Sequence, residues 1–365
     1  MLIAAEQTFI DGALAPGFAL ETDGKTVTGM RYLPEGQSAD MRVRLLAPGL
    51  TDLQVNGGGG VLFNTSPTPE GLRAIRAAHL TLGTAAILPT VITDVAEVME
   101  AAADAVIATK GEEGLLGIHI EGPHIAPGKK GTHEISHIRP LDRRTMAVLK
   151  RLRDEDIPVL LTLAPEVSDP ELMREAAAMG VVLSGGHSMA SAAETREGIA
   201  NGLTMFTHLY NAMPQIESRH PGMIAAAILS DCYIGLIADG IHVEWDALRI
   251  AIAARPRPDR CFLVSDAMPT VGGPPSFSLY GQEIHVEDGR LVNAYGNLAG
   301  AHVSLLDCVT RLHKATGISL AYALSMATEI PRRAMRLPSI RLEEGLPLSQ
   351  VIALDDDLNL LSLVN

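Results

Sequence analysis

Cysteine, long apolar runs and positive charge are all scarce in this chain of 365 residues, and each scarcity excludes a class of protein. The three cysteines, Cys232, Cys261 and Cys308, lie within or beside apolar segments and show no CxxC spacing, which favours buried thiols over disulfides or metal ligands. No window approaches the roughly 18 uninterrupted apolar residues of a membrane-spanning helix. Lys and Arg number 29 against 43 Asp and Glu, and the net charge of −14 disfavours nucleic acid and anionic membranes as partners.

The composition that remains is that of a globular protein from a reducing compartment. Hydrophobic residues make up 47% of the chain, which is enough for a substantial core, and the length allows one large α/β barrel or two ordinary domains. The segment 1–24 contains Glu6, Asp11, Glu21 and Asp23 but neither Lys nor Arg, so it is not a secretory signal. We therefore expect a cytoplasmic protein.

Eight short apolar runs alternate with amphipathic or Ala-rich stretches through the middle of the chain. The runs are Leu50–Asn56, Ala85–Thr90, Leu115–Glu121, Val159–Ala164, Val181–His187, Thr204–His208, Tyr233–Ala238 and Cys261–Asp266. Four of the stretches between them indicate helices: Glu70–Leu82, Asp94–Thr109, Pro170–Met179 and Ala190–Ala200. Near-continuous apolar strands separated by helices are typical of a parallel sheet that is buried on both faces.

Eight such strands predict an α/β fold with a (β/α)8 barrel over residues 49–337, whose active site would lie at the carboxyl ends of the strands. A doubly wound open sheet is the alternative, but it would not easily gather groups from strands three, five, six and eight around one point. Residues 1–48, with a turn at Asp11-Gly12, and residues 338–365 carry β-like pieces that could pair into one small domain. Residues 274–298 are predicted to form an insertion after the eighth strand, with a hairpin around Glu287-Asp288-Gly289.

Four side chains at or next to the ends of these runs carry the candidate chemistry. Glu121 closes the third run, His187 and His208 end the fifth and sixth, and Asp266 ends the eighth. One carboxylate and two imidazoles suit a divalent cation such as zinc, with a position left for water. A carboxylate beside that water is what metal-assisted hydrolysis needs. The alternative is a set of unrelated polar residues at strand ends, with Asp266 as a helix cap or a salt-bridge partner.

Strand parity adds two amides and a rival ligand to this set. Gln54 and Asn56 alternate with apolar residues in the first run, so both should point into the barrel mouth. His119 shares the parity of Glu121 and is therefore a rival ligand, although a role deeper in the barrel fits it better.

Six motifs in consistent order make the prediction specific. They are HIEGPH (119–124), KKGTH (129–133), SGGHS (184–188), THLYNAMP (207–214), ADGIHV (238–243) and VSDAMPTVG (264–272). Together they resemble the N-acetylglucosamine-6-phosphate deacetylases of the amidohydrolase superfamily, over a region from about Pro48 to Gly300. The resemblance implies a TIM-type barrel with a small β-sandwich domain formed by both chain ends, residues 1–48 and 338–365. It also implies a homodimer.

The activity implied by this resemblance is hydrolysis of the acetamide of a 6-phosphorylated amino sugar, which releases acetate and the sugar amine in amino-sugar catabolism. Glu121, His187 and His208 resemble the metal ligands, and Asp266 resembles the residue that acts as general base and then as acid. A metal-activated water would attack the carbonyl, with His133 as a candidate donor to the oxyanion.

The same resemblance supplies candidate substrate-binding positions. They are Thr132, His133, Asn211, Ala212, Arg219, Asp239, His242, Leu298, Ala299 and Gly300. In a chain this acidic, the guanidinium of Arg219 beside Asn211 and His242 would give a phosphate bidentate donors and local positive charge. In related enzymes such contacts can come from a neighbouring subunit.

Many amidohydrolases carry His-x-His on the first strand and bind two metals, but here those positions are Gln54 and Asn56. Amides are poor ligands beside imidazole, so we expect a single divalent ion. Zinc suits the ligands best, and ferrous iron, cobalt or manganese could occupy the same geometry.

Three rival functions remain at this point. The substrate could be N-acetylgalactosamine 6-phosphate. It could also be a cyclic amide or an N-acyl amino acid, as in other amidohydrolases. The third rival is a barrel without catalytic activity that binds a sugar phosphate as a sensor.

Overall fold

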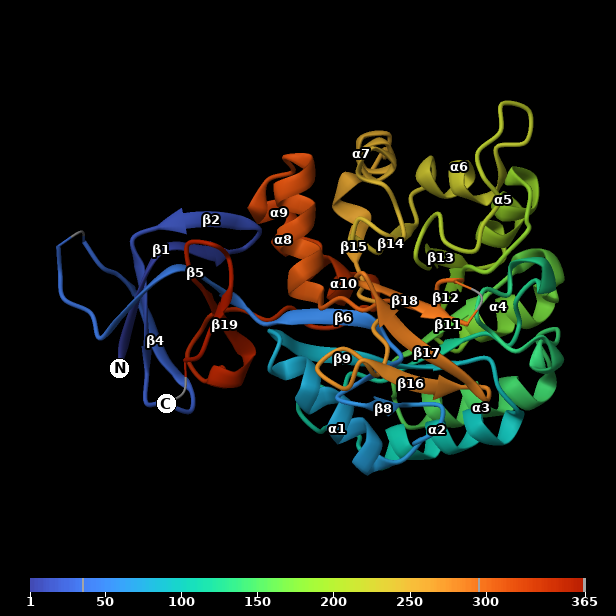
Figure 1. Cartoon of the computed structure of the whole chain (residues 1–365), viewed down its shortest axis with the longest axis horizontal. Helices are drawn as coiled ribbons and strands as arrows, with labels where there is room; N and C mark the ends of the chain where they lie inside the picture. Colours follow the sequence, from blue (N-terminus) through green and yellow to red (C-terminus); the bar gives the residue numbers. More distant parts are fainter. Residues whose placement is uncertain (35, 295, 364–365) are drawn as a thin grey trace.

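The computed structural model describes residues 1–34, 36–294 and 296–363, which form a barrel and a smaller sheet beside it (Figure 1). The barrel occupies the right of that view, and the smaller sheet, which contains the first and last strands of the chain, lies at the left. One large cluster of buried apolar side chains runs through the barrel and its helices, and a second lies within the smaller sheet.

All eight apolar runs are strands of one parallel sheet. They are β6 (Leu50–Val55), β9 (Thr84–Ile92), β10 (Ile118–Glu121), β11 (Val159–Leu163), β12 (Val182–Gly185), β13 (Leu203–Phe206), β14 (Tyr233–Leu236) and β15 (Cys261–Leu263). Each strand pairs with the next along the chain. The first and last strands approach through a parallel bridge between Val55 and Ala267. The sheet is therefore a nearly closed barrel, which confirms the predicted fold.

A buried carboxylate reinforces this closure. The two carboxylate oxygens of Asp52, on the first barrel strand, lie 3.3 and 3.2 Å from the backbone N–H of Ser265, just beyond the last strand. The Asp52 side chain is fully buried, and burial raises its pKa to about 7. The contact places the end of β15, and with it Asp266, next to β6.

Ten helices among the described residues cover the barrel or extend it. They are α1 (Pro69–Leu80), α2 (Ala96–Ala108), α3 (Arg143–Asp154), α4 (Pro170–Ala178), α5 (Ala192–Ala200), α6 (Gly222–Ile228), α7 (Trp245–Ala253), α8 (Leu305–Thr316), α9 (Leu320–Ser325) and α10 (Glu329–Ala334). The four predicted helices are confirmed as α1, α2, α4 and α5. Local sequence sets where they begin: Thr68 caps α1 before a proline, and Ser191 and Glu194 form a reciprocal capping box on α5.

The two chain ends join in one seven-stranded sheet. Its strands are β1 (Leu2–Ile10), β2 (Ala13–Pro16), β3 (Phe18–Thr22), β4 (Val27–Tyr32), β5 (Met41–Pro48), β19 (Val351–Leu354) and β20 (Leu360–Leu361). β5 pairs with β1 on one side and with β19 on the other, so the predicted pairing of the ends is confirmed. The turn at Asp11 and Gly12 is also confirmed, with positive φ angles of 46° and 82°. Residues 364 and 365 of the predicted segment 338–365 lie outside the described residues.

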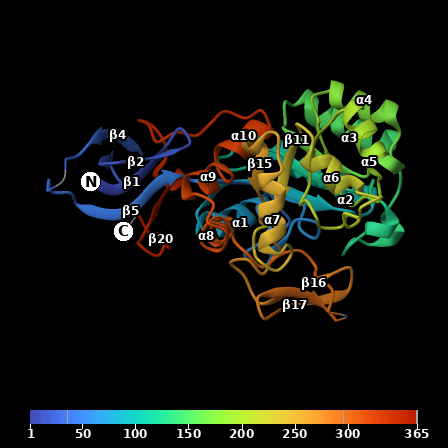
Figure 2. The same ribbon diagram turned by 90° about the horizontal axis from the view of Figure 1, so that it is seen from above.

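A small antiparallel sheet, called the cap sheet below, covers one side of the barrel mouth. It consists of β16 (Ser276–Leu279), β17 (Gln282–Glu287) and β18 (Arg290–Asn293), and Figure 2 shows it projecting from the barrel. Asp288 and Gly289 form the predicted hairpin turn, both with positive φ, as a tight turn between twisted strands requires. The hydroxyl of Tyr280 donates to the carbonyl oxygen of Thr93, which ties the cap sheet to the barrel rim.

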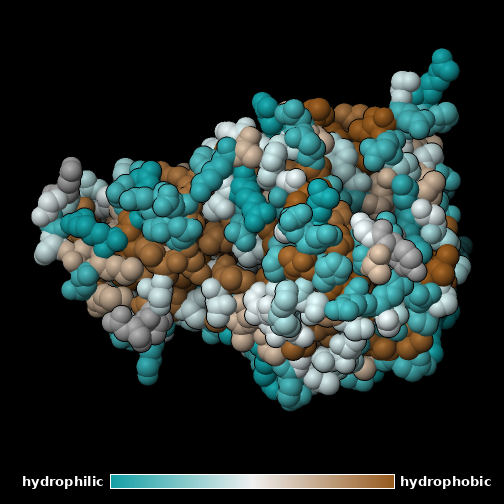
Figure 3. Space-filling view, in the orientation of Figure 1, coloured by the Kyte–Doolittle hydropathy of each residue, from teal (hydrophilic) through white to brown (hydrophobic). Residues whose placement is uncertain are grey.

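Two remaining features complete the fold. The short strands β7 (Gly57–Gly58) and β8 (Val61–Leu62) form a hairpin after β6. Hydrophilic residues are spread over the face of the molecule shown in Figure 3, with an apolar area over the smaller sheet formed by both chain ends. Among the described residues, we find no helix that combines the length and the apolar character needed to cross a bilayer.

Candidate metal centre

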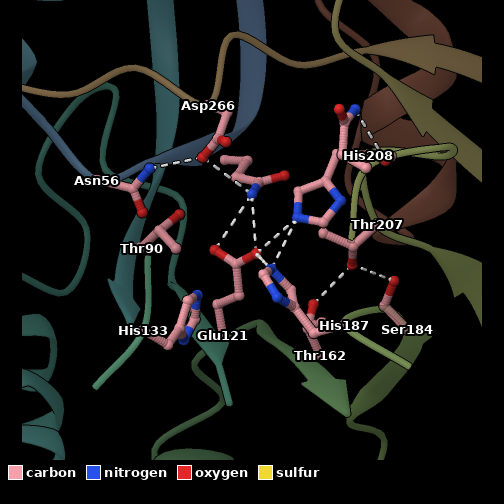
Figure 4. Close-up of polar contacts among 12 residues, drawn as sticks. Asn56, Thr90, Glu121, His133, Thr162, Ser184, His187, Thr207, His208 and Asp266 are labelled. Atoms are coloured by element: carbon pink, nitrogen blue, oxygen red, sulfur yellow. Dashed lines mark hydrogen bonds and ion pairs between the residues drawn. The ribbon is translucent and has the colours of Figure 1, made fainter. Parts of the chain in front are cut away.

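Four side chains predicted from strand ends meet at the carboxyl end of the barrel (Figure 4). Glu121 is the last residue of β10, and His187 and His208 each lie two residues beyond the ends of β12 and β13. Asp266 lies three residues beyond β15. Because parallel strands of a barrel end at the same rim, these groups come together although they are far apart in the sequence.

Three of these four residues have a left-handed backbone. The φ angles are 48° for His187, 28° for His208 and 52° for Asp266. Residues other than glycine rarely adopt such angles, and each instance costs about 1–3 kcal/mol. Strain of this kind persists only where the surrounding structure enforces it, and it clusters at active sites. Its repetition at three strand ends therefore marks this rim as functional.

The donor atoms of the predicted ligands form a small triangle. Oε1 of Glu121 lies 3.1 Å from Nε2 of His187 and 3.0 Å from Nε2 of His208. The two Nε2 atoms are 3.1 Å apart. All three residues are buried, so one carboxylate and two imidazoles face one another away from bulk water.

The tautomer of His187 favours a cation within this triangle, because it makes two lone pairs face each other. Nδ1 of His187 lies 2.8 Å from the carbonyl oxygen of Lys129, which can only accept, so Nδ1 carries the proton. In this tautomer Nε2 directs a lone pair at the Glu121 oxygen, which is also an acceptor. A divalent cation would satisfy both lone pairs, and two imidazoles with a carboxylate are a common donor set for such ions. The residues present therefore fit a metal ion.

His133 supplies a further nitrogen at the same place. One of its ring nitrogens lies within 4.8 Å of donor atoms of Glu121 and His187. Its Nδ1 is 2.6 Å from Oγ1 of Thr93, which leaves Nε2 for the site. Burial lowers the pKa of His133 to about 3, so the ring is neutral. His208 is nearer than His133 to the position of a third ligand, because its Nε2 makes the 3.0 Å contact with the Glu121 carboxylate.

The electrostatics of the triangle favour positive charge. Burial alone would raise the pKa of Glu121, but the imidazoles of His187 and His208 that face its carboxylate outweigh burial and hold that pKa well below its ordinary value. Burial alone would likewise lower the pKa of His208, but the Glu121 carboxylate outweighs burial and raises it. A cation is therefore stabilised at this point even though the groups are buried.

Asp266 is held by the two amides of the first barrel strand. Its Oδ1 accepts hydrogen bonds from Nδ2 of Asn56 at 2.7 Å and from Nε2 of Gln54 at 3.1 Å. The same Gln54 nitrogen lies 3.2 Å from both carboxylate oxygens of Glu121. Burial and the charge of Glu121 raise the pKa of Asp266 to about 6. Since Oδ1 is engaged twice, Oδ2 is the oxygen left to exchange a proton.

His119, the rival ligand, belongs to a polar chain inside the barrel. Its Nε2 lies 2.7 Å from Oγ1 of Thr162, and its Nδ1 lies 3.3 Å from Oγ1 of Thr90. Burial lowers the pKa of His119 to about 4, which keeps it neutral. Oγ1 of Thr162 also lies 2.6 Å from Oγ1 of Thr207, which in turn lies 2.6 Å from Oγ of Ser184. Both nitrogens of His119 are thus paired, as the deeper role requires.

A cavity of about 160 Å³ opens beside these groups. Seven of the predicted substrate-binding residues line it: Thr132, His133, Asn211, Ala212, His242, Leu298 and Gly300. They come from the loop after β10, the loop after β13, the loop after β14 and the segment that follows the cap sheet. Loops of distant sequence position therefore build one pocket over the metal-binding groups.

Three other predicted residues are placed differently. Oδ1 of Asp239 accepts the backbone N–H groups of Ile241 and His242 at 2.8 and 2.9 Å, and its Oδ2 lies 2.6 Å from Nδ1 of His242. Asp239 therefore orients His242, which lines the cavity. Ala299 is fully buried in the cluster beneath the cap sheet. Arg219 is exposed on the loop between β13 and α6, which projects at the top right of Figure 1. It is not among the described residues that line the cavity.

Sequence reasoning missed three residues that shape this site. Thr93 holds His133 through its hydroxyl, and Ile92 and Met268 line the cavity. Ile92 lies two residues beyond the predicted end of its strand, and Met268 lies two residues after Asp266. Their position close to strand ends was the only signal in the sequence, because an apolar side chain there is normally read as core.

No protein-family model matches the chain. The chain is 37% identical to the N-acetylgalactosamine-6-phosphate deacetylase of Shewanella sp. (strain ANA-3), and the match covers 99% of this chain and 94% of that protein. It is 31% identical to the N-acetylglucosamine-6-phosphate deacetylase of Haemophilus influenzae, over 88% of this chain and 82% of that protein.

Solved structures of similar proteins share the whole architecture. The N-acetylglucosamine-6-phosphate deacetylase from Pasteurella multocida matches with a TM-score of 0.87 at 29% identity, covering 99% of this chain and 96% of that one. A mutant of the Mycobacterium smegmatis enzyme in complex with N-acetyl-D-glucosamine-6-phosphate matches with a TM-score of 0.88 at 26% identity, with the same coverage.

Proposed function

Because the chain belongs to the N-acetylglucosamine-6-phosphate deacetylase family of the amidohydrolase superfamily, we propose that it hydrolyses the acetamide of N-acetyl-D-glucosamine 6-phosphate. The products are D-glucosamine 6-phosphate and acetate, and the reaction belongs to amino-sugar catabolism. The observation that carries the proposal is the triangle of Glu121, His187 and His208 donor atoms with the carboxylate of Asp266 beside it.

An unactivated amide resists hydrolysis because water is a weak nucleophile and an amide anion is a poor leaving group. A divalent cation held by Glu121, His187 and His208 supplies Lewis-acid chemistry, which activates water and polarises the carbonyl. Asp266 acts as general base and then as general acid. Its Oδ2 accepts a proton from the attacking water and then donates it to the departing nitrogen. Such acid–base work contributes about 10²–10⁴-fold to the rate.

The amides of Gln54 and Asn56 keep this carboxylate in place while its protonation changes. Both donate to Oδ1 of Asp266, so Oδ2 stays directed at the reacting atoms. Gln54 also donates to Glu121, which keeps the base and the metal-binding carboxylate at a constant separation. Many amidohydrolases carry His-x-His at these positions and bind two metals, whereas here the two amides hydrogen-bond to the carboxylate.

Two histidines of the cavity wall bind the substrate. Nε2 of His133 donates to the carbonyl oxygen as negative charge develops there, while the Thr93 hydroxyl donates to Nδ1 and so selects this tautomer. His242 is aimed at the cavity by Asp239, which leaves its Nε2 for an oxygen of the sugar phosphate.

The assembly is a homodimer in which Arg219 serves the neighbouring subunit. Its exposure on a projecting loop, away from its own cavity, supports this assignment. Mixed dimers of Arg219→Ala and Asp266→Asn subunits test it. If Arg219 acts across the interface, the mixed dimer contains one intact site and recovers activity that neither parent shows. If Arg219 acts within its own subunit, no site is intact and mixing restores nothing.

The metal is zinc, since two imidazoles and one carboxylate match its usual catalytic ligands, and the enzyme works in the cytoplasm. Three free and buried thiols suit that reducing compartment. Metal analysis of protein purified without added metal, followed by reconstitution with zinc, ferrous iron, cobalt or manganese, checks the first statement.

The direct test is release of a free amine and of acetate from N-acetyl-D-glucosamine 6-phosphate by the metal-replete protein. Asp266→Asn is the matched control, because it preserves shape and removes the base. Equal turnover by the two proteins would reject the proposal. Tight binding of the sugar phosphate without acetate release would instead favour a sensor. Arg219→Ala should weaken the binding of a phosphorylated substrate far more than the binding of an unphosphorylated one.

N-acetyl-D-galactosamine 6-phosphate is a second candidate substrate. The relative with 37% identity over 99% of this chain is an N-acetylgalactosamine-6-phosphate deacetylase, which favours including it. The values of kcat/KM for the two epimers, measured side by side, decide between them.

A further inference from the structure

Three large apolar side chains interrupt the polar wall of the cavity next to the metal-binding groups. Ile92, Met268 and Leu298 line the cavity together with Glu121 and Asp266. Ile92 and Met268 also belong to a buried apolar cluster that joins the barrel rim to the cap sheet. Ile92 and Met268 therefore lie on the side of the cavity that is next to the cap sheet.

Ile92 is fixed beside Glu121. The two residues are register partners on the neighbouring parallel strands β9 and β10. The side-chain amide of Asn64 accepts the backbone N–H of Ile92 at 2.9 Å and donates to its carbonyl oxygen at 3.0 Å. Only 3% of Ile92 is exposed, so its side chain is packed against neighbours on nearly all sides.

Met268 is fixed beside Asp266, which precedes it by two residues. Its backbone N–H donates to the carbonyl oxygen of Ala301 at 3.2 Å, and only 1% of the residue is exposed. Gly300 makes the close packing possible, because a Cβ atom there would lie 2.5 Å from Cγ of Met268. The backbone at Gly300 thus holds the Met268 side chain against the cavity.

We infer that Ile92 and Met268 form the acyl pocket, which receives the methyl group of the acetamide and limits the length of the acyl group that is removed. The inference rests on the proposed function. The acetyl methyl is the one alkyl terminus of an N-acetylhexosamine 6-phosphate, whose other substituents are hydroxyls and a phosphate. The acyl carbon must lie between the metal-binding groups and Asp266, and the wall next to both is apolar. A methyl group placed there leaves water for apolar surface.

The pocket admits an acetyl group and rejects longer ones because its two main walls are buried and held by hydrogen bonds. Leu298 differs: it is 37% exposed and also lines a neighbouring cavity of about 460 Å³. Its side chain forms the outer edge of the pocket, where a larger acyl group can displace it. The limit on acyl length is therefore set by Ile92 and Met268. In a pocket of this kind one methylene changes kcat/KM by about 10–200-fold.

The test compares kcat/KM for N-acetyl- and N-propionyl-glucosamine 6-phosphate. For the wild-type enzyme the propionyl substrate should be poorer by about tenfold or more. Ile92→Ala and Met268→Ala should each raise the propionyl-to-acetyl ratio by about tenfold or more, because each opens room for a methylene. Leu62→Ala is the matched control: Leu62 is 3% exposed and belongs to the same cluster, but is not among the described residues that line the cavity.

Two results would overturn the inference. One is a ratio within about twofold of wild type in both alanine variants while N-acetyl turnover persists. The other is an equal rise in Leu62→Ala, which would indicate general loosening of the cluster. Failure of the proposed function is separate, because the wild-type enzyme would then hydrolyse neither substrate. If an alanine variant does not fold, Ile92→Val removes a single methyl group and should raise the same ratio by a smaller factor.

Discussion

Replacing Asn56 with leucine should lower kcat without removing the metal or unfolding the protein. Nδ2 of Asn56 donates to Oδ1 of Asp266 at 2.7 Å, and Asn56 is fully buried. A hydrogen bond to a charged acceptor contributes about 1.5–3 kcal/mol. Because about 1.4 kcal/mol corresponds to a factor of ten in rate, complete loss of this bond from the transition state would lower kcat by about 10–150-fold.

The lower end of that range is the better expectation. Nε2 of Gln54 remains 3.1 Å from the same Asp266 oxygen and continues to hold it. Leucine also removes Oδ1 of Asn56, a buried acceptor without a partner among the described residues, and such an atom costs about 1–3 kcal/mol of stability. We therefore expect kcat to fall by about tenfold while KM and the free energy of unfolding change little.

Gln54→Leu provides the contrast, because Gln54 contacts both Asp266 and Glu121. It should lower kcat and also weaken metal retention, whereas Asn56→Leu should affect kcat alone. The measurements are kcat and KM on the sugar phosphate, metal content per subunit, and urea unfolding of each variant. An Asn56→Leu enzyme with wild-type kcat, or one whose loss of kcat follows its loss of metal, would refute the reasoning.

Three further predictions concern pH, metal removal and backbone strain. The pKa of Asp266 is raised to about 6, so its base form is lost as the pH falls through this value, and a bound cation moves this limb lower. The acid limb of kcat/KM should therefore lie at or below about pH 6 and be absent from the residual activity of Asp266→Asn, and a limb that persists unchanged in Asp266→Asn would contradict this. A chelator should lower the wild-type Tm, since a ligand at about 1,000 times its Kd stabilises the folded state by about 4 kcal/mol. Glu121→Gln should melt at the same temperature with and without chelator. Gly300→Ala should destabilise the protein in urea by more than Gly317→Ala, which costs about 1–2 kcal/mol. The two glycines have φ of +74° and +73°, but only at Gly300 would a Cβ meet a neighbour within 4 Å; equal losses would dismiss the packing argument.

The barrel itself was predictable because its information is local. Each strand is a run of apolar residues long enough to be buried on both faces, and three of the four predicted helices begin at a capping side chain, at Thr68, Asp169 and Ser191. Glu121, His187, His208 and Asp266 could be chosen from sequence, because a chemical group at the carboxyl end of a barrel strand reaches the active site wherever that strand lies in the chain.

Roles within the cavity were less predictable because they depend on how the loops fold over the rim. Asp239 and His242 are three residues apart and were both assigned to the substrate. The structure turns Asp239 toward His242 and presents only His242 to the cavity. Ile92 looked like one more core residue, and its place in the cavity wall depends on where the cap sheet stops covering the rim.

The sequence by itself determined the strands, the helices and the identity of the chemical groups, because periodicity and residue type are properties of short segments. Only the tertiary structure decided the distances among Glu121, His187 and His208. It also decided that Gln54 hydrogen-bonds to two carboxylates. It also decided which apolar side chains face open space. These depend on closure of the barrel, which brings residues from its first and last strands within hydrogen-bonding distance.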